Sequence, residues 1–591
     1  MTTTGAEDVR WDLSLLYAGL DDPAIDADLD GAEADAASIA ERLHGKVAEL
    51  DAAALRDAVH ELEALNERVD KTATFAYLNF ATDTGDSARG ALLQKVEERS
   101  TAIGTKVLFF DLEWAAVPDE RAEELLADPA LDKWRHFLRS ARRFRPHLLS
   151  EPEEKVVAEK SVTGRSAWVR LFTQVTDAIS VPFDGVDLTL DEALSKIHDP
   201  SREVRHRAGE AVTAALQSGL PVRTFIINTV AADASIDDRL RSYPSWIAAR
   251  NLGNEIDDAI VEALVTSVSS RYDLPERWYQ LKARLLGLDE LTEHDRYAPL
   301  LADEREVPWD QAREIVLDSY RSFSREIADI AAGFFDRYID APPSRGKQGG
   351  AFSHPGIPTG HPYVLLNYTA NRREVMTLAH ELGHGVHQVL ASKQGLFNSS
   401  TPLTLAETAS IFGETVTFGR LLADETDPRA RLALVAGRLE DIFASVFRQV
   451  AMNRFEDAVH TARRTEGELS TDRINQEWMR AQRAMFRDSV KLSDAYATWW
   501  SYIPHFIHTP GYVYAYAFGN LLALAIYARY EAEGAAFVPS YLQLLAAGGS
   551  ESPNELAKLV GVDLTDPEFW NAGLKVIEGQ LAEAESLAAS A

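Results

Sequence analysis

Apolar residues along this chain recur mainly every three or four positions, which is the spacing of an amphipathic α-helix. Long stretches rich in Ala, Glu and Leu at 23–66 and 88–128 show this spacing clearly. Strand-like alternation is rare before residue 350, except at 179–190, where a central Asp-Gly pair predicts a β-hairpin. We therefore predict a mainly α protein, divided near residue 190 into an N-terminal helical domain, 1–190, and a larger domain, 191–591.

A different composition begins at Ala341, where glycine and proline are dense as far as Pro358. This density predicts a mobile surface loop without regular structure. Residues 361–368 then predict a short strand, and residues 373–390 predict one helix because their apolar positions follow the helical period. The pattern thus places a small β element directly before a long helix.

The predicted helix at 373–390 carries His380, Glu381 and His384 in the order H-E-x-x-H. Residues at i and i+4 lie on one helix face, about 5–6 Å apart at Cβ, so both imidazoles can reach one Zn²⁺ at roughly 2.0–2.1 Å. Glu381 points to the adjacent side, where it can hold a metal-bound water. With 15 His, and with Glu taken as about half of the 92 acidic residues, chance gives roughly 0.03 matches to this pattern. The motif predicts a metal site, and the strand before it is a suitable edge for β-addition of an extended peptide.

Two glycines, Gly383 and Gly385, lie inside this helix and lower its intrinsic helicity by about 1 kcal/mol each relative to Ala. Such a loss within a helix usually has a packing or a functional reason. We expect the bare backbone at these positions to give a substrate room to approach the metal.

A catalytic zinc ion needs a third protein ligand and one open coordination position. The segment 402–416 predicts a second helix, which carries Glu407 and Glu414 two turns apart. Glu407 follows His384 by 23 residues, enough for a helix end, a turn and an antiparallel return. A carboxylate flanked by Ala, Ile and Phe is costly to bury unless it is paired or metal-bound, so we expect Glu407 to be the ligand. Glu414 has two possible interpretations from the sequence. It either supports the metal ligands from beside them or is a solvated charge on the helix surface.

The composition argues against several other classes of function. A formal net charge of -32 and a pI near 4.9 argue against nucleic acid or anionic membranes as partners, since both attract basic surfaces. The absence of cysteine excludes disulfides, thiolate metal sites and cysteine nucleophiles, so any metal must be held by His, Asp or Glu. The first residues lack the features of a signal peptide, and no run approaches the ~20 apolar residues of a membrane span. We expect a soluble cytoplasmic protein, and the sequence leaves its oligomeric state open.

A second polar cluster lies near the C-terminus, where His505, His508, Tyr512, Tyr514 and Tyr516 fall within twelve residues. Hydrolysis of an amide builds negative charge on the former carbonyl oxygen, and phenol or imidazole donors aimed at that oxygen stabilise it. The cluster therefore indicates a site that stabilises such charge. For any single tyrosine the alternative is a core ring with a bonded hydroxyl.

Several motifs together resemble the oligoendopeptidase F family, bacterial relatives of thimet oligopeptidase. They are H-E-L-G-H-x-x-H at 380–387, A-E-T-A-S-x-x-x-E at 406–414, R-G-K-Q-G-G-A-F at 345–352 and P-H-F…Y-V-Y-A-Y-A-F-G at 504–519. The opening W-D-L-S-x-L-Y and the late F-V-P-S-Y-L-Q-L-L-A-A-G-G-S-x-S-P also look like that family, so the resemblance spans nearly the whole chain.

The resemblance implies a large helical zinc-peptidase fold, with a small β-sheet beside the metal helix and a deep channel that admits short unstructured peptides. By motif, it implies that His380, His384 and Glu407 bind one Zn²⁺ per chain and that Glu381 is the general base. The predicted domain 1–190 then resembles the family's N-terminal domain, and 191–591 resembles its catalytic domain.

The resemblance also implies that His505, Tyr512 and Tyr516 donate to the substrate carbonyl. His508 and Tyr514 offer a competing register in the same short stretch, and we expect them to contact the substrate. In the glycine-rich loop, Gly349 and Gly350 are expected to contact the substrate at the channel mouth. Glu374 matches an acidic position of the family and is a candidate for a role beside the metal ligands.

We therefore predict a zinc-dependent endopeptidase that hydrolyses internal bonds of short oligopeptides. One alternative is a related zinc carboxypeptidase or dipeptidase with the same two helices. The other is a helical peptide-binding protein without catalysis, against which the intact Glu381 counts because binding alone needs no base.

Overall fold

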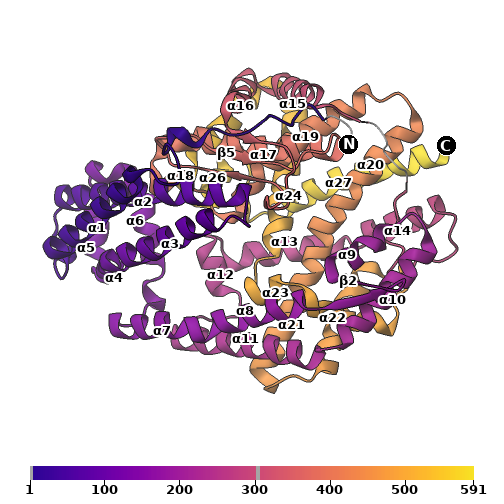
Figure 1. Cartoon of the computed structure of the whole chain (residues 1–591), viewed down its shortest axis with the longest axis horizontal. Coiled ribbons are helices and arrows are strands. Elements are labelled where there is room, and N and C mark those ends of the chain that lie inside the picture. Colours follow the sequence, from indigo (N-terminus) through magenta and orange to yellow (C-terminus); the bar gives the residue numbers. More distant parts are fainter. Residues whose placement is uncertain (1–3, 301–305, 591) are drawn as a thin grey trace. The chain divides into compact units, whose positions relative to one another are not determined.

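The computed structural model describes residues 4–300 and 306–590, which form two compact units (Figure 1). The first unit combines Met1–Leu148, Glu304–Asp424 and Ile526–Asp563, and the second combines Leu149–Asp303, Glu425–Ala525 and Leu564–Ala591. Helices dominate both units, so the prediction of a mainly α fold is confirmed. Each unit gathers three segments that are far apart in the sequence, and the division near residue 190 stays a prediction.

The first unit begins with a helical bundle. Its helices are α1 (Pro23–Leu43), α2 (Ala52–Thr82), α3 (Ser87–Val107), α4 (Phe109–Ala116), α5 (Asp119–Leu126) and α6 (Arg135–Arg143), with 3-10 turns η1 (Leu13–Leu15), η2 (Val47–Glu49), η3 (Pro129–Trp134) and η4 (Arg145–His147). The first three helices pack on one another (Figure 1). Asp22, Asp51 and Asp86 each accept a backbone hydrogen bond at the start of these helices, which explains where they begin.

The rest of the first unit contains the motif helix and a small sheet. Its elements are α15 (Trp309–Phe323), α16 (Arg325–Arg337), β3 (Ile339–Asp340), β4 (Phe352–His354), β5 (Tyr363–Leu365), α17 (Arg372–Ala391), η6 (Ser392–Gln394), α18 (Leu396–Ser399), α19 (Leu403–Asp424), η9 (Gly534–Ala536), α25 (Val538–Ala547) and α26 (Pro553–Lys558). The strand order is β3-β5-β4, with β5 parallel to β3 and antiparallel to β4. The predicted strand and both predicted helices are therefore confirmed. The expectation that this strand is an edge was wrong, because β5 is buried in the middle of the sheet and β4 is an outer strand.

The prediction that residues 341–358 lack regular structure was wrong in part. Part of this stretch forms β4, which pairs with β5 along three residues. Ahead of it, the Gln348 N–H donates a hydrogen bond of 2.8 Å to the last turn of α2. The buried ammonium of Lys347 donates to Asp340 Oδ1 over 2.6 Å. The composition gave no sign of these distant partners, which hold the loop in one conformation.

In the part of the second unit that the structure describes, the regular elements are helices and one hairpin. Its elements are α7 (Glu151–Thr163), α8 (Arg165–Asp177), β1 (Ser180–Phe183), β2 (Val186–Thr189), α9 (Leu190–Ser195), η5 (Lys196–His198), α10 (Arg202–Gln217), α11 (Leu220–Leu240), α12 (Ala248–Gly253), α13 (Asp258–Ser270), α14 (Asp273–Leu285), α20 (Pro428–Ile442), the π-turn η7 (Phe443–Phe447), α21 (Arg448–Glu466), α22 (Thr471–Phe486), η8 (Asp494–Tyr502), α23 (His505–His508) and α27 (Pro567–Ser590). One further helix, α24 (Tyr514–Glu533), begins in this unit and ends in the first.

The predicted hairpin is confirmed. Strands β1 and β2 pair in antiparallel register, from Ser180 opposite Thr189 to Phe183 opposite Val186. The turn between them is Asp184-Gly185, with φ of 51° and 85°. Two positive φ values in a two-residue turn match the twist of the strands, which is why Asp-Gly suits this position.

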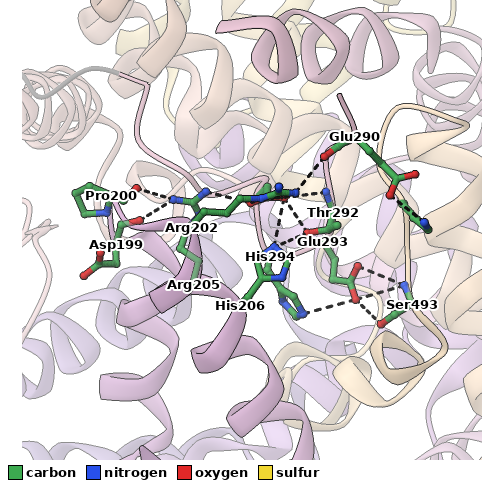
Figure 2. A network of polar contacts seen from close by, with 12 residues as sticks. Asp199, Pro200, Arg202, Arg205, His206, Glu290, Thr292, Glu293, His294 and Ser493 are labelled. Atoms are coloured by element: carbon green, nitrogen blue, oxygen red, sulfur yellow. Dashed lines mark hydrogen bonds and ion pairs between the residues drawn. The ribbon is translucent and has the colours of Figure 1, made fainter. Parts of the chain in front are cut away.

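A charge network fixes α10 to the segment that follows α14 (Figure 2). The side chain of Asp295 is fully buried and accepts hydrogen bonds from Arg202 Nη2 at 2.8 Å and Arg205 Nη2 at 3.0 Å. Thr292 donates to the same carboxylate at 2.9 Å and also contacts His206. Burial alone would raise the pKa of Asp295, but the hydrogen bonds from Arg202, Thr292 and Arg205 outweigh it and hold the pKa well below its ordinary value.

No helix in the described parts of the chain is long and apolar enough to cross a membrane.

Candidate functional site

Helices α17 and α19 of the first unit approach each other so closely that two crossing points require glycine. A Cβ on Gly383 of α17 would lie 2.6 Å from the carbonyl oxygen of Ala409 on α19. A Cβ on Gly413 of α19 would lie 2.3 Å from the Tyr320 hydroxyl of α15 and 3.1 Å from the carbonyl oxygen of Ala379 on α17. The contact at Gly383 is short enough to force the two backbones apart. The glycines therefore let the two helices bring their polar side chains together.

The expectation that Gly383 and Gly385 leave room for a substrate was wrong. The space at Gly383 is filled by the backbone of α19, as described above. The space at Gly385 is filled by the ring of Phe334, whose nearest atom would lie 2.5 Å from an added Cβ. Both glycines are there for packing, and the first of them sets the distance between the two helices that carry the site.

The side chains of His380, His384 and Glu407 converge between these helices. His380 Nε2 and His384 Nε2 lie 3.2 Å apart. Glu407 Oε2 lies 3.4 Å from the first of these nitrogens and 3.5 Å from the second. Within the described chain, this is the one group of three or more His, Cys, Asp or Glu ligand atoms that all lie within 4.8 Å of one another.

These three distances fit a zinc ion. Tetrahedral coordination with bonds near 2.0–2.1 Å separates neighbouring ligand atoms by about 3.3–3.4 Å, close to the observed 3.2, 3.4 and 3.5 Å. Two imidazoles and one carboxylate are also a donor set that catalytic zinc uses, with a fourth position left for water or substrate. The residues present therefore suit this metal in number, chemistry and spacing.

Glu414 fixes the orientation of the His380 ring. Its Oε1 lies 2.5 Å from His380 Nδ1, so a proton on this nitrogen is donated to the carboxylate and Nε2 is the nitrogen that faces Glu407 and His384. Burial alone would lower the pKa of His380, but the hydrogen bond and charge of Glu414, with the charges of Glu381 and Glu407, raise it to about 9. Two roles were left open for Glu414, a position beside the metal ligands and a solvated helix charge. The contact with His380 supports the first.

Ser410, one turn after Glu407, holds the carboxylate of the expected ligand. Its hydroxyl donates to Glu407 Oε2 over 2.8 Å. Burial would raise the pKa of Glu407, but the hydrogen bond and charge of His384, the charge of His380 and the Ser410 hydroxyl lower it to about 2. Ser410 is not among the site residues predicted from the sequence. Its i+3 spacing from Glu407 was the available signal, because residues three apart are neighbours on a helix.

Glu381 is buried beside the two histidines. Burial is the main reason that the pKa of its carboxyl group is raised, and the charges of His380 and His384 partly oppose this effect. The charged groups with the largest effects on the pKa of Glu381 and Glu407 are nearby histidines and glutamates. A carboxylate with a raised pKa is better able to accept a proton near neutral pH than an ordinary glutamate.

In the second unit, three of the predicted donors form a cluster of their own. The rings of His505 and Tyr512 are nearly parallel, with centroids 6.3 Å apart, and Tyr516 meets Tyr512 edge-on at 5.1 Å. His505 Nε2 lies 3.3 Å from the Tyr516 hydroxyl. Burial, with the charges of Arg448 and His508, lowers the pKa of His505, so that its imidazole is neutral near pH 7.

The other two residues of that stretch point elsewhere. His508 Nε2 lies 3.2 Å from the Thr173 hydroxyl of α8, away from the ring cluster. Tyr514 is fully buried, and its hydroxyl accepts a hydrogen bond of 2.8 Å from Asn254. The structure thus brings His505, Tyr512 and Tyr516 together and places His508 and Tyr514 apart from them.

The remaining predicted residues of the first unit lie in two places. Gly349 and Gly350 are exposed in the loop before β4, and a Cβ on either would meet no atom within 4 Å. Glu374 lies in the first turn of α17, where its backbone N–H donates to Asn371, the capping residue. The charge of Glu374 acts on Tyr368, and it is not among the groups that shift the pKa of His380.

Comparison with known proteins decides the family. Residues 195–576 match the model of Peptidase family M3, and residues 113–180 match a model described as Oligopeptidase F. The chain belongs to peptidase family M3. Members of this family are metallopeptidases, which agrees with the His380, His384 and Glu407 cluster.

Individual relatives of this M3 peptidase are similar along most of its length. Oligopeptidase PepF of Bacillus subtilis (strain 168) is 29% identical to this chain, and the matching region covers 92% of this chain and 82% of the Bacillus protein. A crystal structure of oligoendopeptidase-F from Enterococcus faecium shares its fold with a TM-score of 0.72, at 22% identity over 95% of this chain and 99% of that one. The crystal structure of a candidate peptidase from Chlamydophila abortus also has this fold, with a TM-score of 0.86 and 23% identity over 98% of both chains.

Proposed function

We propose that this M3 peptidase is a zinc-dependent endopeptidase that hydrolyses internal peptide bonds of short oligopeptides. The observation that carries the proposal is the separation of the three ligand atoms by 3.2, 3.4 and 3.5 Å, which matches the edges of a zinc tetrahedron. The names of the relatives in Bacillus subtilis and Enterococcus faecium support oligopeptides as the substrates.

The buried carboxylate of Glu381 is proposed as the general base. A zinc ion, when bound, polarises the scissile carbonyl and lowers the pKa of its water toward 7. Glu381 accepts a proton from the attacking water and later gives it to the leaving amine. Glu414 keeps the Nδ1 proton of His380 in place throughout, so that the ring presents the same nitrogen to the metal.

Tyr512 and Tyr516, with His505, are proposed to donate hydrogen bonds to the carbonyl oxygen as it gains negative charge. Their side chains gather in one cluster, whereas the Tyr514 hydroxyl is already bonded in the core. Tyr516→Phe or Tyr512→Phe should lower kcat by about 10²–10³, with a smaller change in KM. The matched variant Tyr514→Phe should keep its kcat. Equal kcat in all three variants would leave the role to His505, His508 or the metal alone.

The outer strand β4 is proposed to bind the extended peptide backbone by β-addition. Phe352 and His354 lie opposite Leu365 and Tyr363 of the central strand, which leaves the backbone of Ser353 on the outer side. Gln388 of α17 donates to the Ser353 carbonyl oxygen over 3.3 Å and so ties this strand to the metal helix. The exposed loop at 349–350 is proposed to contact the substrate as well.

A digest with graded substrates tests the proposed function. The purified protein is analysed for zinc and then incubated with unstructured, end-blocked peptides of increasing length and with one intact folded protein. We expect one zinc ion per chain, internal cleavage of the peptides up to a length limit, and no cleavage of the folded protein, whose unfolding costs about 5–15 kcal/mol. Rapid degradation of the folded protein would contradict the proposed narrow channel.

The same digest separates the alternatives. A carboxypeptidase or dipeptidase would leave end-blocked peptides intact and cleave those with free ends. A peptide-binding protein would cleave neither. Short unstructured peptides are thus the proposed partners, and a cytoplasmic location, which the sequence predicts, is part of the proposal.

A further inference from the structure

The second unit contains a cavity of about 630 Å³ that the proposed reaction does not use. Its walls come from α7, α8, α11, α12 and α21, together with Pro510 from the loop after α23. Helices α8 and α11 pack against each other beside it (Figure 1). Cavities of about 300–1,000 Å³ with apolar walls and a few charged groups are typical of small-ligand sites.

One wall of the cavity is an aromatic pair. The rings of Trp246 and His460 are stacked, with centroids 4.7 Å apart and an interplanar angle of 16°. The Trp246 Nε1–H donates to Asp457 over 2.7 Å, which fixes the indole. Burial lowers the pKa of His460 to about 3, so its ring is neutral. Its Nδ1 is buried and has no hydrogen-bond partner among the described residues. The pair offers a rigid, flat surface with one unused polar atom.

Two guanidinium groups line the same cavity without a carboxylate partner. Arg165 of α8 donates to the carbonyl oxygen of His508 over 3.1 Å, and Arg250 of α12 donates to that of Pro510 through two nitrogens at 3.3 Å. Neither forms an ion pair with any carboxylate in the described part of the chain. The two guanidinium groups lie in one cavity and hold carbonyls two residues apart in the chain. Burial lowers the pKa of Arg165, the charge of Asp233 opposes this effect, and the positive charge of Arg250 adds to it. An anion between them would relieve this repulsion.

The acidic residues of the cavity are mostly neutralised already. Asp237 pairs with Arg241 at 2.9 Å, and Asp238 pairs with Arg464 at 2.5 Å. The exposed Asp233 is the acidic neighbour left near Arg165, where its charge acts on that guanidinium. The cavity therefore combines an unpaired cationic end, an aromatic wall and one exposed acid, so that its chemistry favours a ligand with a carboxylate and an apolar body.

We propose that this cavity binds the carboxyl end of a short peptide, with the carboxylate between Arg165 and Arg250 and the last side chain against Trp246 and His460. The choice of a peptide as the ligand rests on the proposed function. Guanidinium groups suit this role because their planar donors match the two oxygens of a carboxylate. The aromatic pair would favour a large apolar residue at the end of the peptide.

The cavity is connected to the proposed carbonyl donors through one short loop. Arg165 and Arg250 hold the carbonyls of residues 508 and 510, and Glu456 accepts the Gly511 N–H at 2.9 Å. Gly511 has φ of 74°, and a Cβ there would lie 2.6 Å from Ile247. The next residue is Tyr512. A carboxylate bound to the two arginines would therefore act on the segment that carries the donor cluster.

The test uses two probes that differ in charge alone, N-acetyl-phenylalanine and its amide, on the zinc-loaded full-length protein. Calorimetry measures affinity, and hydrogen exchange followed by mass spectrometry locates the bound probe. We expect the acid to bind at least tenfold more tightly than the amide and to slow exchange at 243–253 and 456–464. Arg165→Gln and Arg250→Gln should weaken binding of the acid at least tenfold. The matched control Arg239→Gln, an exposed arginine of α11 outside the cavity, should bind as the wild type does.

Three results would overturn the proposal. They are equal affinity for acid and amide, protection confined to α17 and α19, and unchanged affinity in both arginine variants. Because the arginines also hold the loop, Trp246→Leu gives a second test that leaves those contacts intact, and it should weaken both probes. If the protein cleaves peptides but binds the acid and the amide equally, the proposed role of the cavity is refuted and the proposed function is not. If the protein binds the acid more tightly but cleaves no peptide, the proposed function is refuted and the carboxylate site is not.

Discussion

The molecule contains two clusters of histidine and carboxylate groups that look alike in composition and differ in what balances their charge. In the second unit, the buried Asp295 lies beside His206 and accepts hydrogen bonds from two arginines, Arg202 and Arg205. In the first unit, Glu407 lies beside His380 and His384, whose charges are the main ones that lower its pKa. Arginines are the main compensating partners in one cluster, and histidines are in the other.

This difference separates a structural network from a site that is built for a ligand. A buried carboxylate is costly unless a positive charge or hydrogen bonds compensate it. The Asp295 network has that compensation within the chain (Figure 2). The cluster of Glu381, Glu407 and Glu414 gathers three acids around two imidazoles, so that a divalent cation would balance it. The excess of acids around the two histidines therefore supports the proposed metal site.

The largest contrast is expected in the rate of catalysis. We expect Glu381→Gln to lower kcat by about 10²–10⁴ because it removes the general base, while zinc content stays at one per chain. Asp295→Asn should keep the kcat of the wild type per folded molecule, since its network serves structure. Both are measured with an end-blocked fluorogenic peptide, with metal analysis of the same samples. Near-normal kcat in zinc-loaded Glu381→Gln would refute the mechanism.

The free energy of unfolding should be affected more by Asp295→Asn than by Glu381→Gln. Asp295→Asn leaves the guanidinium of Arg205, whose side chain is 3% exposed, without its carboxylate, and breaking such a buried pair costs about 3–5 kcal/mol. Urea denaturation measures this loss. Because the pKa of Asp295 is lower in the folded chain than in the unfolded one, its contribution is present above about pH 4 and is lost as the pH falls below that value.

The control for this prediction is Glu203→Gln. Glu203 is 82% exposed and lies 3.9 Å from Arg207 in the same helix, and such surface pairs contribute about 0–1 kcal/mol. A loss in Glu203→Gln as large as that in Asp295→Asn would show that burial is not what makes the Asp295 network important.

Metal affinity should respond to Glu414, which touches the cluster through His380. We expect Glu414→Gln to weaken zinc binding by about 10–100-fold, the usual effect of removing a partner that orients a histidine ligand. Glu407→Ala, which removes a proposed ligand, should lose zinc altogether under the same chelator competition. If Glu407→Ala keeps its zinc and Glu414→Ala does not, the ligand has been assigned to the wrong carboxylate.

The smallest effect is expected from the helix contact beneath the metal cluster. Gly383→Ala places a methyl group 2.6 Å from the Ala409 carbonyl oxygen, and overpacking of this kind costs about 1–3 kcal/mol. Gly333→Ala in α16 is the matched variant, because a Cβ there meets nothing within 4 Å, and it should stabilise the chain by up to about 1 kcal/mol. Thermal unfolding compares the two, and equal melting temperatures would contradict the packing role of Gly383.

Sequence reasoning succeeded where the signal is local. The turn at Asp184-Gly185, the strand near Tyr363 and the helix that carries His380 and His384 all follow from the spacing of nearby residues. The gathering of Glu407 with the two histidines was also expected, because two helices joined by a short connection return antiparallel. Such features depend on the chain within a few turns of the residue in question.

The misses all involve partners distant in sequence. Whether Gly383 provides space or packing depends on α19, which the pattern of α17 alone does not contain. The loop before β4 is held by α2, more than 250 residues earlier in the chain, through a hydrogen bond from Gln348 to Ala81. The unpaired state of Arg165 and Arg250 is likewise visible only once the neighbouring helices are placed. Composition and period carry no information about such contacts.

The division of each compact unit among three chain segments also affects how the protein is made on the ribosome. Chains are synthesised from the N-terminus at about 5–20 residues per second, and domains generally fold as units. All of His380, His384 and Glu407 have been added by the time residue 525 is reached, yet the first unit then lacks its last segment, Ile526–Asp563, and the second lacks Leu564–Ala591. Helix α25, which packs against α17, belongs to that missing segment. A nascent chain that has reached residue 525 therefore holds all three proposed metal ligands before either unit has its last segment.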